Sequence, residues 1–470
     1  MTKYIAYPEY IETGEEWLGS IPNHWVVMQI KNLSVVKRGA SPRPIDDIKY
    51  FDENGEYAWT RISDVTASDT YLVTAPQRLS DLGSSLSVKL EPESLFLSIA
   101  GSVGKPCITG MKACIHDGFV YFPELKIPNK FLFYVFAGEQ AYKGLGKFGT
   151  QLNLNTDTVG GIKIGRAPAH ELQNIVNFLD HETAKIDTLI AKQQQLIQLL
   201  KEKRQAVISH AVTKGLNPDA PMRDSGVEWL GAVPAHWDVK PLRYLGTCQN
   251  GINIGAEFFG SGYPFVSYVD AYKTETLPEF GSGLVQSTEH DRKVYSVILG
   301  DVIFTRTSET IEEIGLSSTC LKTIDDATFA GFLIRFRPTS NLLDSGFSKY
   351  YFRNKLMRTF FTKQMNIVTR ASLSQGLLKK LPVPLPSLNE QMEISEFLDN
   401  KSIIFDKLTE RTKNAIEFMQ ERRIALISAA VTGKIDVRNW VSPDASSTAN
   451  TPNTPNTSDS TATTNTVAVA

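Results

Sequence analysis

The chain has 470 residues, of which 42% are hydrophobic and 21% are charged, a composition that is ordinary for a soluble globular protein. The formal net charge of −2 argues against binding of nucleic acid through an overall basic surface, so DNA contacts would need local basic patches or a partner protein. Four cysteines without a CxxC pair argue against a disulfide framework or a zinc site. No run of 18 apolar residues and no signal-peptide stretch follow Met1, so we expect a cytoplasmic protein without a membrane span.

A motif near the N-terminus recurs later in the chain. The segment 14–25, GEEWLGSIPNHW, returns as GVEWLGAVPAHW at 226–237. Only two copies, so far apart, predict two related globules in a pseudo-symmetric chain rather than a solenoid. We expect His24 and His236 to pack at the start of a strand rather than to catalyse, because no partner acid or nucleophile recurs with them.

The first globule, residues 1–168, is predicted to be a mixed α/β domain. Short apolar or alternating runs, interrupted by Gly and Pro, predict strands at 57–62, 94–99 and 118–122. The aromatic-rich stretch 129–138 predicts a short helix, and the stretch 144–155, rich in Gly and Asn, predicts a loop.

The second globule, residues 216–386, repeats this order of features with little sequence identity. Its predicted strands are 264–269, 301–305 and 331–336, and its predicted helix is 347–354. The flanking motifs and the order of elements are similar, whereas the sequences between them differ. This indicates two domains of one architecture that contact different targets.

A long helix is predicted after each globule, over residues 169–215 and 387–437. Apolar residues spaced by three and four form one seam on each helix, and the two seams keep one common register. We therefore predict an antiparallel coiled coil of roughly 65 Å, in which Glu182 lies near Arg422 and Gln193 near Thr412. The seam residues are Ile175, Leu179, Ile186, Leu189, Leu196, Leu200 and Val207 on the first helix, and Ile394, Leu398, Phe405, Leu408, Ala415, Met419 and Leu426 on the second.

The predicted fold class is thus α+β, with two similar mixed α/β domains joined by two long antiparallel coiled-coil helices about an internal pseudo-twofold axis. The remaining residues, 438–470, form a low-complexity tail, which is mostly Ser, Thr, Asn, Ala and Pro after residue 444. Such a segment buries too little apolar surface to offset its ordering entropy, so we expect it to be disordered.

Several catalytic motifs are absent from the sequence. There is no GxxxxGK[ST] phosphate loop, no Asn/Asp-Pro-Pro-aromatic loop of amino-methyltransferases, no GxGxxG after a strand and no HExxH. Asp117, Glu124 and Lys126 follow the D…ExK order of metal nucleases, but the second globule has no counterpart, so we expect no nuclease site and no metal.

Loops at equivalent places in the two globules carry side chains that suit base edges and phosphates. Arginine can bind guanine through two hydrogen bonds, glutamine can bind adenine in the same way, and backbone N–H groups of Gly-rich loops can meet phosphate. Ordinary solvated loops have a similar composition, so the residues alone leave both interpretations open. The candidates are Arg61, Lys105, Lys147 and Gln151 in the first globule, and Arg306, Thr307, Arg370 and Ser372 in the second.

The order of these features resembles the specificity subunit of type I restriction-modification systems. The resemblance rests on two EWLGxxPxHW motifs, two variable globules, two Pro-marked exits and two FLD helices that end in AVT, and it covers about residues 6–437. The second exit, PLPSLNEQ at 384–391, matches the PLPxxxEQ pattern of the family, whereas the first, RAPAHELQ at 166–173, is a looser version.

The resemblance implies that each globule is a target-recognition domain for one half of a split DNA site, in double-stranded DNA. It also implies that the helices set the spacing between the halves and dock two methyltransferase subunits, which bind S-adenosylmethionine and methylate adenine N6 after flipping the base. Two restriction subunits that use ATP and Mg²⁺ complete the complex, and this chain itself takes no cofactor. Among the seam residues, the expected spacer and docking positions are Leu179, Ile186, Leu200, Leu398, Phe405 and Met419.

Two other functions are compatible with the residues alone. One is a non-catalytic coiled-coil scaffold that carries two protein-binding globules and never contacts DNA. The other, a methyltransferase with a degenerate motif, is disfavoured by the missing catalytic loop. Whether an adenine methyltransferase joins the chain at two copies would distinguish these hypotheses.

Overall fold

The computed structural model describes residues 4–142, 147–148, 151–152, 154–308, 314–364 and 371–442. The chain forms two compact units, of which the first combines Met1–Lys192 with Ala415–Ala470 and the second is Gln193–Asn414. The predicted tail beyond residue 442 lies outside the described residues. Among the helices that the structure describes, none is both long and apolar enough to cross a membrane.

The globule of the first unit contains two mixed sheets. Their strand orders are β4-β12-β9-β10-β6 and β7-β5-β11-β8, with parallel pairing between β10 and β6 and between β11 and β5. The elements are β1 (Tyr10–Glu12), β2 (Ser20–Pro22), β3 (Val26–Gln29), α1 (Ile30–Leu33), β4 (Lys37–Arg38), η1 (Ile48–Tyr50), β5 (Tyr57–Thr60), α2 (Ile62–Ala67), β6 (Tyr71–Leu72), β7 (Arg78–Leu79), α3 (Asp81–Ser85), β8 (Val88–Leu90), β9 (Leu95–Ser98), β10 (Pro106–Thr109), β11 (Ala113–Ile115), β12 (Phe119–Tyr121), α4 (Asn129–Ala137), β13 (Lys147–Phe148), β14 (Gln151–Leu152), α5 (Thr156–Gly161) and β15 (Lys163–Arg166).

The globule of the second unit contains an antiparallel sheet, β19-β26-β22-β24, and a mixed sheet, β21-β20-β25, in which β20 and β25 are parallel. Its elements are β16 (Met222–Asp224), β17 (Ala232–Pro234), β18 (Asp238–Pro241), η2 (Leu242–Tyr244), β19 (Gly246–Asn250), η3 (Ala256–Phe258), β20 (Phe259–Val266), α7 (Tyr268–Lys273), β21 (Gly283–Val285), α8 (Glu289–Val294), β22 (Val302–Thr305), β23 (Thr307–Ser308), β24 (Ser317–Thr319), β25 (Thr328–Phe329), β26 (Leu333–Pro338), α9 (Ser345–Arg353), α10 (Lys355–Gln364), β27 (Ala371–Ser372), α11 (Gln375–Leu378) and β28 (Pro382–Leu385).

The first predicted strand of each globule ends earlier in the structure than the sequence indicated. In the first globule β5 ends at Thr60, and α2 follows because the Asp64 carboxylate accepts a hydrogen bond from Arg61 N (2.9 Å). In the second globule β20 ends at Val266, and Asp270 accepts from Ser267 N (2.8 Å) at the start of α7. A local cap of this kind satisfies backbone groups at a helix start and therefore stops the strand.

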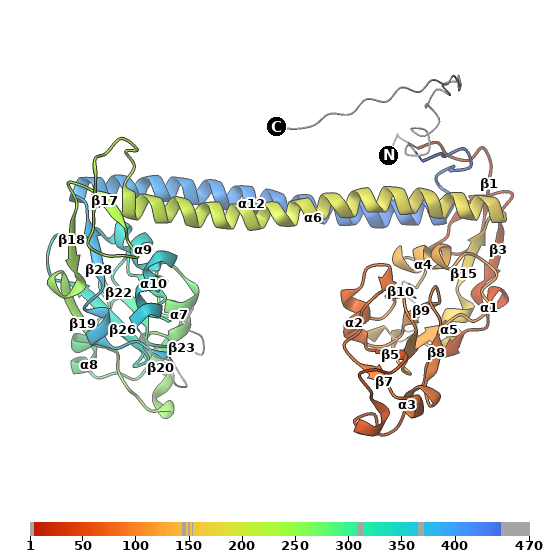
Figure 1. Ribbon diagram of the computed structural model, residues 1–470, viewed down its shortest axis with the longest axis horizontal. Coiled ribbons are helices and arrows are strands. Elements are labelled where there is room, and N and C mark those ends of the chain that lie inside the picture. The colour runs from red at the N-terminus through yellow and green to blue at the C-terminus, as the bar shows by residue number, and fades with distance from the viewer. Residues whose placement is uncertain are drawn as a thin grey trace, which may run out of the picture. The chain divides into compact units, whose positions relative to one another are not determined.

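The two long helices are α6 (Ala169–Lys214) and α12 (Leu388–Val431), and they lie side by side (Figure 1). In the first unit Asp187 of α6 pairs with Arg423 of α12 (2.8 Å), and in the second unit Arg204 pairs with Asp406 (2.6 Å). The beginning of each helix thus packs against the end of the other, which confirms the predicted antiparallel pairing. The Tyr4 hydroxyl donates to Glu182 (2.9 Å), and burial followed by this contact raises the pKa of Tyr4 to about 12, an effect that Arg422 opposes.

The predicted seam is buried at its ends, whereas two of its positions in the middle of α6 are exposed. Ile175, Leu179 and Ile394 are fully buried beneath the globules, whereas Leu189 and Leu196 are each more than 40% exposed. The neighbouring Ile190 and Ile197 are less exposed than these two leucines, so the buried face of α6 is displaced there by one residue from the predicted seam.

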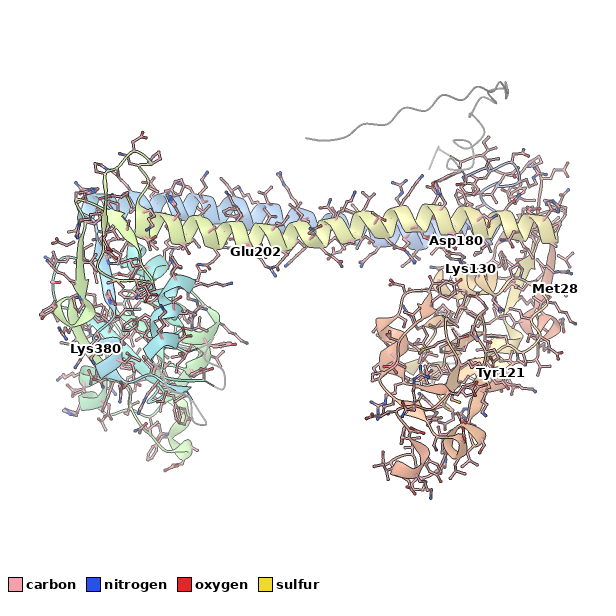
Figure 2. The ribbon with its side chains drawn as sticks, viewed as in Figure 1. Met28, Tyr121, Lys130, Asp180, Glu202 and Lys380 are labelled. Carbon is pink, nitrogen blue, oxygen red and sulfur yellow. The ribbon has the colours of Figure 1, made fainter. Side chains whose placement is uncertain are left out.

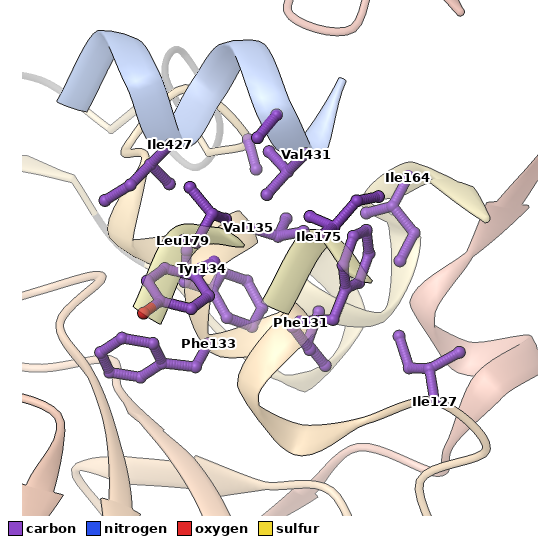
Figure 3. Close-up of a cluster of buried hydrophobic side chains, with 14 of the residues drawn as sticks. Ile127, Phe131, Phe133, Tyr134, Val135, Ile164, Ile175, Leu179, Ile427 and Val431 are labelled. Atoms are coloured by element: carbon purple, nitrogen blue, oxygen red, sulfur yellow. The ribbon is translucent and has the colours of Figure 1, made fainter. Parts of the chain in front are cut away.

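The core of the first unit forms where α4, α6 and α12 meet (Figure 3). Phe131 and Tyr134 of α4 pack with Leu179 of α6 and with Ile427 and Val431 of α12, and each is at least 97% buried. Burial of a side chain of this size contributes about 1.5–3 kcal/mol relative to exposure. The recurring helix ends therefore belong to the hydrophobic core of the globule rather than to a free coiled coil.

Candidate nucleic-acid interface

A buried carboxylate joins the first globule to the first turn of α6. Trp25 Nε1 donates a hydrogen bond to Glu171 (2.9 Å), His24 Nε2 lies 2.9 Å from the same carboxylate, and the Tyr7 hydroxyl donates to it as well. Glu171 is only 1% exposed, and burial together with this carboxylate raises the pKa of Tyr7. A side chain at Gly433, just after α12, would collide with Pro22, so the end of the second helix closes the same joint.

The second unit repeats this helix joint with fewer contacts. Trp237 Nε1 donates to Glu390 (3.0 Å), His236 Nε2 lies 3.0 Å from it, and Gly215 lies against the Trp237 ring. The packing role expected for His24 and His236 agrees with these contacts. The reason given for it was wrong, because a partner acid does recur, 147 and 154 residues away along the chain. The acid is the Glu of each Pro-marked exit.

The FLD sequences form a second repeated contact between globule and helix. Asp180 of α6 accepts from Lys130 Nζ (2.7 Å) of α4 (Figure 2). The same carboxylate accepts from the Tyr134 hydroxyl (2.7 Å), also on α4. In the second unit, Asp399 of α12 accepts from the Tyr350 hydroxyl (2.6 Å) and from Lys349 Nζ (2.5 Å) on α9. The recurring residues thus attach each globule to its long helix, which leaves the rest of the globule free to vary.

In each globule three segments meet at one corner of the sheets, which we call corner 1 and corner 2. Corner 1 is formed by 38–43, 99–101 and 116–118, and corner 2 by 250–255, 306–308 and 330–332. The backbone contacts correspond: Ile99 N donates to Gly118 O (2.8 Å), as Arg306 N donates to Phe332 O (3.0 Å).

A glycine holds the same place in both corners. A Cβ atom at Gly39 would lie 2.1 Å from His116 O, and one at Gly251 would lie 2.1 Å from Ala330 O. Both positions therefore require glycine, because a real Cβ cannot approach a carbonyl so closely. Gly39 and Gly251 are as far apart in the chain as Gly14 and Gly226 of the EWLG motifs, so the repeat extends from these motifs into the globules.

Corner 1 carries a polar cluster around Asp117. Ser41 Oγ donates to its carboxylate (3.3 Å), Arg43 lies 3.5 Å from it, and Arg38 Nε donates to the Asp117 carbonyl (2.5 Å). The Arg43 side chain is 82% exposed, so its guanidinium is positioned yet open to a ligand. Sequence reasoning missed Arg38, Ser41 and Arg43.

The sequence places Asp117 in a D…ExK order, but the structure gives it another role. Its carboxylate organises the Ser41 and Arg43 side chains instead, and Glu124 and Lys126 belong to the exposed segment after β12. Within the described parts of the chain, no group of three or more His, Cys, Asp or Glu side chains could hold a metal ion.

His116 in corner 1 is held as a neutral ring. Its Nδ1 accepts from Gly118 N (2.8 Å), and burial lowers the pKa of His116 although Asp117 opposes the shift. In the unfolded chain the pKa of His116 is about 6.5. The contribution of the neutral ring to the free energy of unfolding is therefore complete above roughly pH 6.5. This contribution is lost as the pH falls from there toward the lower pKa of the folded protein.

When the pH falls from about 7.5 to about 5.5, we expect the melting temperature of the wild-type chain to decrease more than that of a His116→Gln variant. Gln cannot take up a proton, so the difference between the two melting curves reports His116 alone. A pH dependence that is the same in both proteins would contradict the assignment.

Corner 2 and the strand β27 beside it bring together three of the four candidates of the second globule. Thr307 pairs with Ser372 between β23 and β27, and Leu373 N donates to Arg306 O (2.7 Å). The Tyr268 hydroxyl also donates a hydrogen bond to Thr307 O (2.7 Å). The remaining candidate, Arg370, lies outside the described residues.

The candidates of the first globule are more dispersed. Arg61 is exposed at the start of α2, where its guanidinium donates to Gln77. Lys105 instead lines a cleft of about 560 Å³, together with Asp187 and Arg423 of the long helices. Lys147 and Gln151 belong to the β13–β14 pair, and their side chains are outside the described part of the structure.

Comparison with known proteins identifies the family. A model described as type I restriction modification DNA specificity domain matches residues 22–199 and 259–418, more than half of the chain. The chain belongs to this family. It is therefore a DNA specificity subunit of a type I restriction-modification system, which is a non-catalytic subunit.

Relatives of this specificity subunit match most of its length. The EcoKI specificity subunit from Escherichia coli (strain K12) is 24% identical over 458 residues, which cover 92% of this chain and 94% of that protein. The EcoBI specificity subunit from Escherichia coli is 22% identical and covers 76% of this chain and 77% of its own.

Two solved structures share the fold. One, solved to explain complex assembly and conformational transition of the type I R-M system, has a TM-score of 0.64 at 13% identity and covers 88% of this specificity subunit and 99% of that chain. The HsdS subunit from Thermoanaerobacter tengcongensis has a TM-score of 0.51 at 14% identity and covers 90% and 100%.

Proposed function

We propose that this specificity subunit recognises an asymmetric site in double-stranded DNA that consists of two half-sites. Residues 1–168 and 216–386 are the two target-recognition domains, and 169–215 and 387–437 are the helices that set the distance between the half-sites. The observation that carries the proposal is the pair of corners, which share one backbone frame and differ in side-chain chemistry. Two domains with the same backbone arrangement but different side chains at the corners are suited to two different base sequences.

Side chains at the corners and at the other candidate positions have the chemistry of base readout. Arg43 and Arg61 in the first domain and Arg306 in the second can each donate two hydrogen bonds to a guanine edge. The hydroxyls of Thr307 and Ser372 add shorter contacts to bases or phosphates. Lys105, Lys147, Gln151 and Arg370 complete the proposed DNA-binding set, with the lysines directed to phosphates.

The helix pair docks two adenine-N6 methyltransferase subunits, through which two restriction subunits join. Apolar side chains on α12 support this role, because Ile403, Ile404 and Phe418 are each about half exposed or more. Of the expected docking positions, Leu200, Phe405 and Met419 are partly exposed and can contact a partner. Leu179, Ile186 and Leu398 are buried and act by holding the helices in their units.

The partners account for the chemistry and for part of the charge. S-adenosylmethionine belongs to the methyltransferase subunits, ATP and Mg²⁺ belong to the restriction subunits, and this chain takes no cofactor. A formal charge of −2 leaves too little basic surface for phosphate contacts over a whole bipartite site. The methyltransferases therefore supply much of the phosphate neutralisation.

Co-expression with an adenine methyltransferase from the neighbouring genes tests the proposal. We expect native mass spectrometry to find two methyltransferases per specificity subunit, and methylome sequencing to find N6-methyladenine in one asymmetric bipartite motif. Phe418→Asp should lower the methyltransferase stoichiometry, while Phe280→Asp, at a 76% exposed position of the second globule, should not. A chain that binds other proteins but no methyltransferase, and that directs no methylation, would support the scaffold alternative instead.

A further inference from the structure

One large aromatic side chain projects from corner 2 into solvent. Phe332 is 63% exposed, whereas Leu333 beside it is fully buried and Ala330 is 9% exposed. It occupies the turn between β25 and β26, where the chain leaves one sheet and enters the other. An exposed phenylalanine by itself is common, so its meaning depends on how the turn is held and on what surrounds it.

The backbone that carries Phe332 is fixed on both sides. Phe332 O accepts from Arg306 N (3.0 Å), and Leu333 N donates to Ala330 O (2.9 Å). Ala330 forms a bridge with Ile252, and Ala330 N donates to Val266 O (3.0 Å). The ring is therefore presented by a rigid turn, which reduces the ordering entropy that binding would otherwise cost.

The ring stands next to groups that suit base recognition. Arg306 is bonded to Phe332 through its backbone, and the exposed Asn253 packs against the adjacent glycine. In corner 1 the corresponding position is Gly118, where a side chain would collide with the His116 ring, because a Cβ atom would lie 2.4 Å from it. The aromatic ring is thus part of what distinguishes the second recognition domain from the first.

We propose that Phe332 stacks on or inserts beside a base step of the second half-site, next to the base that Arg306 reads. This inference rests on the proposed function and names the partner of corner 2 more narrowly as the face of a base. Apolar side chains inserted between base steps unstack and kink a duplex, and aromatic rings stack on exposed bases. A wedge also lowers the cost of opening the duplex when a partner methyltransferase flips a nearby adenine.

The test uses the complete specificity subunit with its methyltransferases and a duplex that carries the methylated site, with 2-aminopurine placed at successive positions. The wild-type complex is expected to change the fluorescence at one step of the second half-site. Phe332→Ala should remove that change and weaken binding by about 5- to 150-fold, with the first half-site unaffected. Phe332→Trp should restore both signals, and Phe280→Ala, at another exposed phenylalanine of the same unit, should alter neither.

The alternatives give different results. If Phe332→Ala binds the duplex as tightly as wild type with an unchanged 2-aminopurine signal, the wedge is ruled out while the proposed function stands. If the variant loses methyltransferase subunits in native mass spectrometry, the ring is a protein contact and the wedge is again ruled out. A wild-type complex that fails to bind the methylated site would overturn the proposed function and this inference together.

Discussion

Replacing Glu171 by alanine is expected to destabilise the first unit by about 3–5 kcal/mol. The substitution removes the common acceptor of Trp25, Tyr7 and His24 from a site that is almost fully buried. Buried donors without a partner cost more than the hydrogen bonds themselves contribute, because they were desolvated on folding. Urea unfolding followed by tryptophan fluorescence would measure the loss, since Trp25 belongs to the joint.

Two matched variants distinguish the loss of the Glu171 contacts from the destabilisation that any substitution at a helix start could cause. Glu171→Gln keeps one carbonyl acceptor and should lose less stability than Glu171→Ala. Glu390→Ala should also lose less stability than Glu171→Ala, because the Glu390 side chain is 24% exposed. Among the described residues, Glu390 accepts from Trp237 and lies near His236, but it has no counterpart of the bond from Tyr7. Equal unfolding midpoints for wild type and Glu171→Ala would show that the joint does not stabilise the unit.

The two helix joints explain why the EWLG motifs recur while the globules diverge. Each joint contains a Trp and a His from the motif, a Glu from the first turn of one long helix and a glycine after the end of the other. All of these contacts are needed wherever a globule is attached to a helix pair. None of them lies at a corner, so the corners could change without disturbing the attachment.

The fold was predictable from the sequence to the extent that it depends on short-range patterns. The spacing of apolar residues indicated α6 and α12, the aromatic stretch indicated α4, and the alternating runs indicated β9 and β12. The partner of His24 was not predictable in this way, because Glu171 is distant in the chain and meets the ring only through folding.

The candidate site was predictable only in part, for the same reason. Thr307 and Ser372 lie on different segments, and their pairing between β23 and β27 was not indicated by the sequence. Arg43 escaped notice because its role depends on Asp117, which follows it after several intervening strands and comes near only when the sheets form. The available signal was that Gly39 and Gly251 keep the spacing of the EWLG motifs, and alignment of the two globules at that spacing finds both corners.

Arg43→Ala and Arg306→Ala are expected to have reciprocal effects on the DNA sequence that is methylated. Loss of Arg306 should relax one base position in the second half-site only, and loss of Arg43 should relax one position in the first half-site only. A base contact of this kind discriminates by about 1–3 kcal/mol, so methylation of sites with that base changed should rise by about 5- to 150-fold relative to the correct site. Methylome sequencing of cells that carry each variant with its partners measures both effects.

The reciprocal design excludes the simplest alternative, a general loss of affinity. An arginine that only neutralises phosphate would weaken binding to every sequence and reduce its salt dependence, without relaxing either half-site. Arg243→Ala serves as the control, because Arg243 is exposed in the second domain but packs on Tyr244 outside corner 2. If both half-sites stay unchanged in Arg43→Ala and Arg306→Ala, or if each variant alters both, the corners are not where the two domains read their separate sequences.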